Sequence, residues 1–157
     1  FSLNRMSHLL KRIELSAEEG FEDFQRNDKS LANQPILVMS RVTDMLLRSI
    51  DYESAKQKRI QNYKILESAL GSRNKLKLKL TDNSVPMVYP HWTEEKGLRN
   101  RLISQRIYVA TYWPNVFHWT KEGMLEYCLV ENLIPLPIDQ RYGIAEMEKI
   151  VRAIKHV

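Results

Sequence analysis

The sequence predicts an α+β fold, in which a small, mostly antiparallel sheet of three to four strands is packed with helices and preceded by two to three long N-terminal helices. Through the first 70 residues, apolar side chains recur at the three- and four-residue spacing of helices. From residue 76 onward, short strand-like segments alternate with shorter helical ones. Helices first, and strands alternating with helices afterwards, is an order typical of α+β domains.

Two helical patterns open the chain. The first covers residues 3–13, and Ser16 followed by Glu19 is a capping-box pattern from which a helix restarts. Residues 27–35 are polar and rich in turn formers, so we expect a loop there. A second helix is expected over residues 38–49, because apolar residues again recur at helical spacing.

A third helix is expected between Asp51 and Gly71. The Asp51 carboxylate suits the N-cap position, where it accepts a hydrogen bond from a backbone N–H of the first turn. Tyr63, Leu66 and Leu70 form the apolar face of this helix. Gly71 stands where a C-terminal cap is expected.

Four later segments have strand character: residues 76–80, 87–89, 107–111 and 133–138. Pro86 and Pro90 flank the second segment, and Pro135 and Pro137 lie within the fourth. Proline has no N–H to donate to a ladder, so these positions mark strand ends or a sheet edge.

Three helical segments separate or follow these strands. We expect a helix over residues 93–105 and a terminal amphipathic helix over residues 144–154. Between them, a short helix is expected to bury one apolar face, which consists of Met124, Leu125, Cys128 and Leu129.

Composition limits the function classes. The chain has 157 residues, a net charge of +5 and one cysteine, which excludes an internal disulfide and a cysteine-based zinc site. A reducing, cytoplasmic location is therefore expected. No apolar run approaches the roughly 20 residues of a membrane-spanning helix, so no membrane partner is expected.

The positive charge is spread along the chain. The densest basic run, from Arg73 to Lys79, alternates with leucines, which favours a half-buried strand over a phosphate-binding role. No stripe of basic and aromatic residues occurs, so we expect no nucleic-acid partner.

Motif searches identify no self-contained active site. The sequence has no glycine-rich phosphate loop, no HExxH metal motif and no G-x-S-x-G nucleophile elbow. The four histidines are isolated in sequence, and Cys128 is interpreted as core packing. No catalytic residue, cofactor-binding residue or metal ligand is therefore assigned.

Three segments carry a resemblance to a known family. They read VPMVYP at residues 85–90, RIYVATYWP at residues 106–114, and LIPLPIDQRY at residues 133–142. Their order and spacing resemble the C-terminal small domain of the DegT-type, pyridoxal-phosphate-dependent sugar aminotransferases of fold-type I. With the helices that precede them, the likeness covers about residues 39–157.

The resemblance implies a transferase that moves an amino group to a keto-sugar, nucleotide-linked or otherwise, during sugar biosynthesis. In that family the catalytic lysine and most cofactor contacts belong to the large domain. Pyridoxal phosphate is thus expected in the full-length parent and not in this fragment, which we expect to be inactive alone. The implied partners are the missing N-terminal large domain, a second copy in a homodimer, and a small-molecule sugar substrate.

The same resemblance divides the chain. Residues 1–37 are interpreted as a helical remnant of the interdomain region, and residues 38–157 as the small domain. The chain starts at Phe1 without an initiator methionine, which we interpret as the start of a fragment.

Four residues are expected to contact substrate. Tyr112 and Trp113 occupy the place where many relatives have a histidine followed by an aromatic residue, and His118 is a nearby substitute for that histidine. Arg141 can bind two oxygens of a carboxylate or phosphate with its planar fork. Each has a simpler alternative: His118 as a surface residue, and Arg141 in an ion pair with a neighbouring carboxylate.

Two other function classes stay open from the sequence. The chain is either a catalytically degenerate relative or a stand-alone binding and interaction module that uses the small-domain fold. A stand-alone module should cover the apolar side chains of its first helices. A domain taken from a larger enzyme should leave them exposed or bury them in an oligomer.

Overall fold

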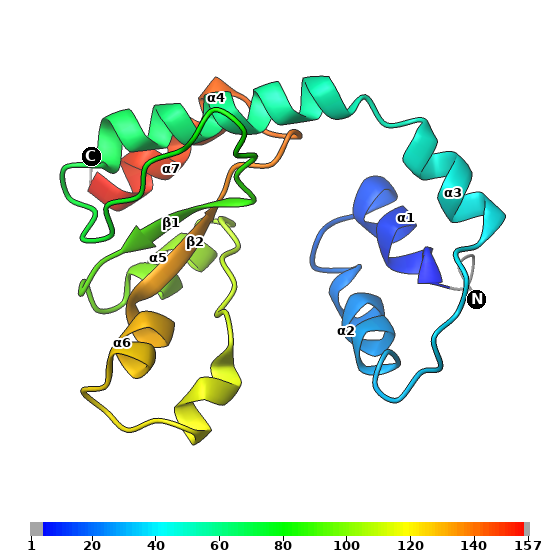
Figure 1. Ribbon diagram of the computed structural model, residues 1–157, viewed down its shortest axis with the longest axis horizontal. Coiled ribbons are helices and arrows are strands. Elements are labelled where there is room, and N and C mark those ends of the chain that lie inside the picture. Colours follow the sequence, from blue (N-terminus) through cyan, green and yellow to red (C-terminus); the bar gives the residue numbers. More distant parts are fainter. Residues whose placement is uncertain (1–4, 156–157) are drawn as a thin grey trace. The chain divides into compact units, whose positions relative to one another are not determined.

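The computed structural model describes residues 5–155, and it divides into two compact units. Unit 1 lies within Phe1–Ile50, and unit 2 within Asp51–Val157. In chain order, Figure 1 shows α1 (Ser7–Glu14), α2 (Phe21–Lys29), α3 (Arg41–Arg48), α4 (Tyr52–Leu70), β1 (Val88–Trp92), α5 (Leu98–Ser104), the 3-10 helix η2 (Pro114–His118, drawn without a label), α6 (Leu125–Asn132), β2 (Leu133–Pro137) and α7 (Ile144–Lys155).

Unit 1 consists of three short helices rather than the long N-terminal helices predicted from the sequence. They have 8, 9 and 8 residues. The expected hydrogen bond of the capping box forms, since the Ser16 hydroxyl accepts from the Glu19 N–H at 3.2 Å. It lies in the turn that precedes α2 and does not begin the helix. The helix expected from residue 38 begins only at Arg41, because the Ser40 hydroxyl caps it by accepting from the Thr43 N–H at 3.2 Å. Residues 3 and 4 of the first predicted helix lie outside the described residues.

Polar contacts hold α1 against α2. The Asp23 carboxylate is buried, and the Lys11 ammonium lies 2.9 Å from it. The hydrogen bond from Lys11 holds the pKa of Asp23 below its ordinary value. No large apolar side chain of residues 5–50 is buried. Unit 1 therefore has no apolar core of its own among its described residues.

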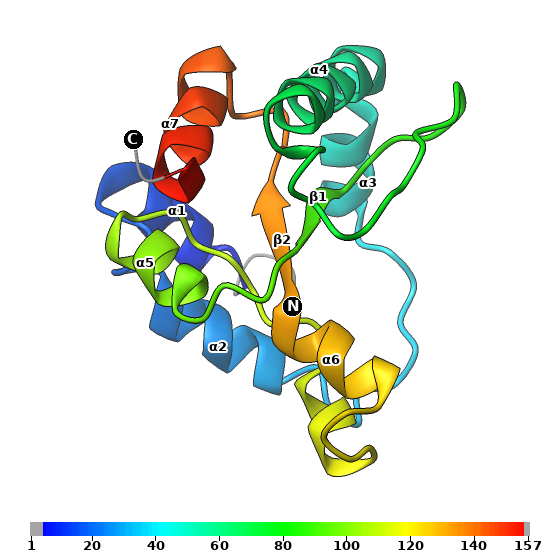
Figure 2. The same ribbon diagram turned by 90° about the vertical axis from the view of Figure 1, so that its left-hand side faces the viewer.

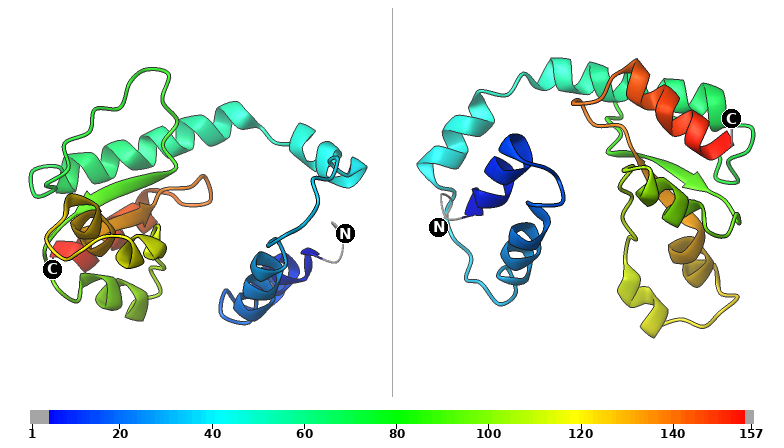
Figure 3. Two further views of the ribbon diagram at one scale, coloured as in Figure 1. Left: turned by 60° about the horizontal axis from the view of Figure 1, so that its bottom comes forward. Right: turned by 180° about the vertical axis from the view of Figure 1, so that it is seen from behind.

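Unit 2 contains the hydrophobic core. Helices α4 and α7 pack side by side, and α4 also contacts β1 while α5 contacts α7 (Figure 3). The buried side chains come from these elements, from β2 and the residue that follows it, and from the segment after α5: Tyr63, Leu66, Leu70, Tyr89, Leu98, Leu102, Ile107, Val109, Ile134, Leu136, Ile138, Met147, Ile150, Ala153 and Ile154.

The sheet has two antiparallel strands, β1 and β2, and not the three to four predicted from the sequence (Figure 2). Pro90 faces Pro135 in the register, and neither residue has an N–H. The ladder hydrogen bonds of this register therefore belong to the neighbouring pairs, such as Tyr89 with Leu136. Pro135 and Pro137 then lie at outward-facing positions of β2, where a third strand would need donors that proline lacks.

A side chain occupies the outer edge of β1. The Asn74 amide donates to the Pro90 carbonyl at 2.9 Å and accepts from the Trp92 N–H at 2.9 Å. Its oxygen also accepts from the Leu76 N–H at 3.0 Å. Residues 76–80 were predicted to be a strand, but they form no ladder, because Asn74 already satisfies the edge that they would pair with.

A second side chain bridges the outer edge of β2. The Arg99 guanidinium donates to the Leu133 carbonyl at 3.0 Å and to the Ala110 carbonyl. Residues 107–111 keep the alternating burial of a strand, with Ile107 and Val109 inward, yet they are not hydrogen-bonded into the sheet. Arg99 thus links this segment to β2 where the sequence predicted a third strand.

Tyr89 joins β1 to α4 inside the core. Its hydroxyl donates to Glu67 Oε2 at 2.7 Å, and its ring lies 5.1 Å from that of Tyr63. Burial, reinforced by the adjacent carboxylate, raises the pKa of Tyr89 above its ordinary value. The phenol therefore remains a neutral hydrogen-bond donor throughout the physiological pH range.

Replacing Asn74 should destabilise unit 2. Asn74→Ala leaves the Pro90 carbonyl and the Trp92 N–H without their partner, and each unsatisfied buried backbone group costs on the order of 1–3 kcal/mol. We expect the free energy of unfolding to fall by about 2–3 kcal/mol. Urea titration followed by tryptophan fluorescence measures it, because all three tryptophans lie in unit 2.

The matched control is Asn100→Ala, at an exposed asparagine on α5. It should change the unfolding free energy by less than about 0.5 kcal/mol. Equal effects of the two substitutions would show that the Asn74 amide does not hold the edge of β1.

Candidate functional site

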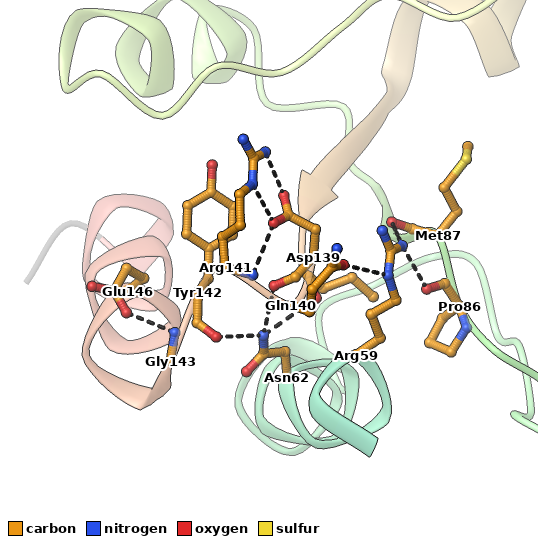
Figure 4. Close-up of polar contacts among 11 residues, drawn as sticks. Arg59, Asn62, Pro86, Met87, Asp139, Gln140, Arg141, Tyr142, Gly143 and Glu146 are labelled. Carbon is orange, nitrogen blue, oxygen red and sulfur yellow. Dashed lines mark hydrogen bonds and ion pairs between the residues drawn. The ribbon is translucent and has the colours of Figure 1, made fainter. Parts of the chain in front are cut away.

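The loop between β2 and α7 is held from below by α4 (Figure 4). The buried Asn62 side chain donates to the carbonyl oxygens of Ile138 at 3.2 Å, Asp139 at 3.3 Å and Tyr142 at 3.1 Å. Its Oδ1 is also buried and has no hydrogen-bond partner among residues 5–155. One amide of α4 therefore fixes the backbone of the loop that carries Arg141.

Arg59, one turn earlier on α4, joins the same loop to the start of β1. Its Nε donates to Gln140 Oε1 at 3.1 Å, and its Nη1 donates to the carbonyls of Pro86 at 3.3 Å and Met87 at 3.2 Å (Figure 4). This guanidinium is thus used to connect two segments of the fold.

The Arg141 guanidinium forms a two-pronged ion pair with Asp139. Nε lies 2.8 Å from Oδ1, and Nη2 lies 3.0 Å from Oδ2. Burial alone would raise the pKa of Asp139, but the hydrogen bonds and charge of Arg141 outweigh it and hold that pKa below its ordinary value. The pKa of Arg141 is raised by the same pair. The fork expected to bind a substrate anion is therefore engaged with a carboxylate of its own loop.

The N-terminus of α7 is likewise occupied by its own helix. The Gly143 N–H donates to Glu146 Oε2 at 2.7 Å, and this bond lowers the pKa of Glu146. A carboxylate already sits where the helix dipole would attract an external anion. This end of unit 2 has its charges paired.

A separate cavity of about 200 Å³ lies at the other end of β2. We call it the aromatic cavity; it is lined by Tyr112, Trp113, Val116, Glu126, Leu129, Val130 and Leu133. Its walls are η2 with the two residues before it, α6, and the first residue of β2. Nearly all of this lining is apolar, and Glu126 is the one charged residue among those that line it.

Trp113 has an unusual backbone conformation at the rim of the aromatic cavity. Its φ of 51° and ψ of 50° are left-handed, and Pro114 follows it. A bulky residue in this region costs on the order of 1–3 kcal/mol, and a following proline disfavours helical conformations further. The indole is nevertheless 64% exposed, so burial of its own ring does not compensate for this cost.

The four residues expected to contact substrate fall into two places. Tyr112 and Trp113 line the aromatic cavity, with ring centroids 5.5 Å apart. His118, the last residue of η2, is exposed and is not part of the lining. Arg141 follows the far end of β2, which at about 3.3 Å per residue is roughly 17 Å long. The structure therefore brings only Tyr112 and Trp113 together.

The sequence analysis missed the α6 side of the aromatic cavity. It assigned Met124, Leu125, Cys128 and Leu129 to the buried face, but Met124 and Leu125 are exposed. The residues that line the cavity from this side are instead Glu126, Leu129, Val130 and Leu133, with helical i, i+3, i+4, i+7 spacing. A glutamate at the first position of this set masked the pattern.

Other chemistry is limited in the described chain. Within residues 5–155 no cluster of histidine, cysteine, aspartate and glutamate has the geometry to hold a metal ion. No helix of that same range has the length and apolar character needed to cross a membrane. His91 is buried on β1, and burial lowers its pKa, so it is neutral at physiological pH. His156 lies outside the described residues.

Comparison with known proteins identifies no family. A scan against family models, a search of curated proteins and a search of solved structures each found no match to this chain. The likeness to the DegT-type small domain therefore depends on the amino-acid sequence alone.

The ion pair of Asp139 should make the free energy of unfolding depend on pH in the acidic range. The Asp139 pKa is lower in the folded chain than the unfolded value near 3.9, so its contribution is present above that pH and is lost as pH falls through the folded pKa. The pair is largely solvent-exposed on the Arg141 side, so we expect no more than about 1 kcal/mol. Urea titrations of wild type and Asp139→Asn between pH 7 and pH 3 measure this, and the difference between the two curves should begin to shrink below about pH 4.

Asp44→Asn provides the comparison, because Asp44 pairs with Arg48 on the surface of α3 in unit 1. It should leave the acid response of unit 2 unchanged. A constant difference between Asp139→Asn and wild type across the whole pH range would contradict the prediction.

Proposed function

We propose that this chain is the small domain of a pyridoxal-phosphate-dependent aminotransferase that acts on a keto-sugar, nucleotide-linked or otherwise, in the cytoplasm. The domain works beside a large domain that carries the cofactor, and the parent enzyme is a homodimer. The three segments at residues 85–90, 106–114 and 133–142 support the family. In unit 2 the first and last of them contribute the paired strands β1 and β2.

The observation that carries the proposal is the uncovered apolar surface of unit 1. Helices α1 and α3 bury no residue, and Val38 in the segment between α2 and α3 is 97% exposed. Many large apolar side chains of residues 9–50 are exposed, among them Ile13, Ile36, Met39, Met45 and Leu46. Surfaces of this kind normally meet another protein surface. A neighbouring domain of the same enzyme, or a second subunit, is the cover that the proposal supplies.

The residues present do not fit the cofactor itself. A lysine that forms a Schiff base needs a desolvated pocket that tunes its amine. All twelve lysines lie within the described residues, and none is buried. We therefore assign the cofactor-binding lysine to the large domain and derive no chemical step within this chain.

A non-catalytic binding module is the second candidate function. The aromatic cavity favours it, because the cavity is formed entirely by residues 112–133 of unit 2 and requires no other domain. A catalytically degenerate relative of the family would share the features of both candidates. The presence of a cofactor-binding lysine in the natural gene product separates the two enzyme-like alternatives.

The test is to map the cofactor on the natural gene product that contains residues 1–157. After purification with pyridoxal phosphate and reduction with borohydride, we expect one fully labelled lysine peptide, located outside residues 1–157. Residues 1–157 alone should retain no stoichiometric visible absorbance band after desalting, because their lysines are solvated. Amino transfer to a keto-sugar by the gene product is the accompanying activity assay.

Two results would overturn the proposal. One is a single stoichiometric label on a lysine within residues 1–157. The other is a gene product that retains no cofactor at all, which would leave the binding module as the remaining function. Weak labelling spread over several surface lysines is the background expected of any protein and serves as the control.

A further inference from the structure

Two of the residues that line the aromatic cavity carry aromatic rings set at an angle to each other. The rings of Tyr112 and Trp113 are inclined by 59°, with centroids 5.5 Å apart. Aromatic faces attract a cation placed within about 6 Å of the ring centroid, and tryptophan attracts it most strongly. A small group lodged beside these two residues can therefore contact both rings.

The charge in the aromatic cavity is negative and uncompensated by a side chain. Glu126 has no ion pair and no side-chain hydrogen bond within the part of the chain that the structure describes. It lies in the first turn of α6, where the helix dipole favours a carboxylate. The dipole explains why the residue is tolerated. Because Glu126 is exposed and is also one of the lining residues, its negative charge lies beside the cavity and acts on any bound molecule.

The remaining lining restricts the ligand further. Val116, Leu129, Val130 and Leu133 offer only apolar contacts, so a molecule with several hydroxyl groups would lose hydrogen bonds to water without replacement. The volume of about 200 Å³ is below the range of roughly 300–1,000 Å³ typical of sites for larger ligands. An anion would be repelled by Glu126. These features exclude a nucleotide and disfavour a bare sugar ring.

We propose that the aromatic cavity binds a small organic cation with an apolar body, such as a methylated ammonium group. The rings of Tyr112 and Trp113 contact the methyl groups and the charge, the aliphatic wall excludes water, and Glu126 neutralises the cation. Trp113 has a left-handed backbone, lines the cavity and is 64% exposed, so its indole is accessible to a bound group. This site is independent of the proposed transferase, because no residue outside residues 112–133 takes part.

Choline and its uncharged carbon isostere, dimethylbutanol, test the site. They are titrated into the chain while the three tryptophan indole N–H resonances are followed by NMR at constant ionic strength. We expect choline to bind saturably in the millimolar range and to shift the Trp113 resonance, which the variant Trp113→Leu identifies. The isostere should bind roughly tenfold or more weakly, because it lacks the cation–π and carboxylate attractions.

Matched variants separate charge from packing. Glu126→Gln should weaken choline binding about three- to tenfold and leave the isostere unchanged. Glu131→Gln, on the same helix but outside the lining, should leave both unchanged. Trp113→Leu should reduce choline binding about tenfold, whereas Trp119→Leu, at an exposed tryptophan outside the cavity, should not.

Three outcomes would overturn the proposal. The first is equal binding of the isostere and choline, which would show that the cavity selects only apolar groups. Glu126→Gln and Glu131→Gln would behave alike if the carboxylate merely capped α6. Absence of saturable choline binding, with wild-type far-ultraviolet circular dichroism, would show that no cation site exists.

Discussion

The side-chain amide of Asn74 takes the place of a strand along the outer edge of β1, where it both donates to and accepts from the backbone. Arg99 fulfils part of the same role along β2. In both places a side chain replaces strand pairing. The prolines of the two strands favour this, because they lack the N–H donors that a regular ladder needs along its edges. With only two strands, the sheet covers little area, and α4 and α7 must supply most of the remaining core.

This arrangement also determines what each end of β2 can do. At the end near α4, Asn62 and Arg59 hold the loop through three backbone carbonyls and the Gln140 side chain, and Arg59 also binds two carbonyls before β1. The charges of Asp139, Arg141 and Glu146 are bound within the same region. At the end near α6, no comparable network fills the space. A cavity remains there, walled by side chains that make no polar contact with one another. The hydrogen-bonded loop thus lies at one end of β2, and the aromatic cavity lies at the other.

Local patterns predicted most of the helices and both strands that form. The Asp51 cap, the Tyr63–Leu66–Leu70 face and the terminal helix all depend on contacts within a few residues, which periodicity records. The failed strands at residues 76–80 and 107–111 depend on partners far away in sequence, and the amides and guanidinium that replaced those partners leave no periodic signal. Tyr112 and Trp113, which the family resemblance named as substrate contacts, line the aromatic cavity, whereas Glu126 was not singled out because a charged residue does not stand out in an apolar pattern.

The prolines of β1 and β2 have a consequence for self-assembly. Proline removes donors from the outer edges of this ribbon and Asn74 occupies another, so the sheet is a poor template for cross-β growth. The segment at residues 36–39 is the opposite case: Ile-Leu-Val-Met, uncharged, exposed and outside any ladder. Pro35 borders this segment as a gatekeeper on one side, and the Ser40 cap of α3 ends it on the other. Its short length between these two boundaries limits the strand that it could add to another chain.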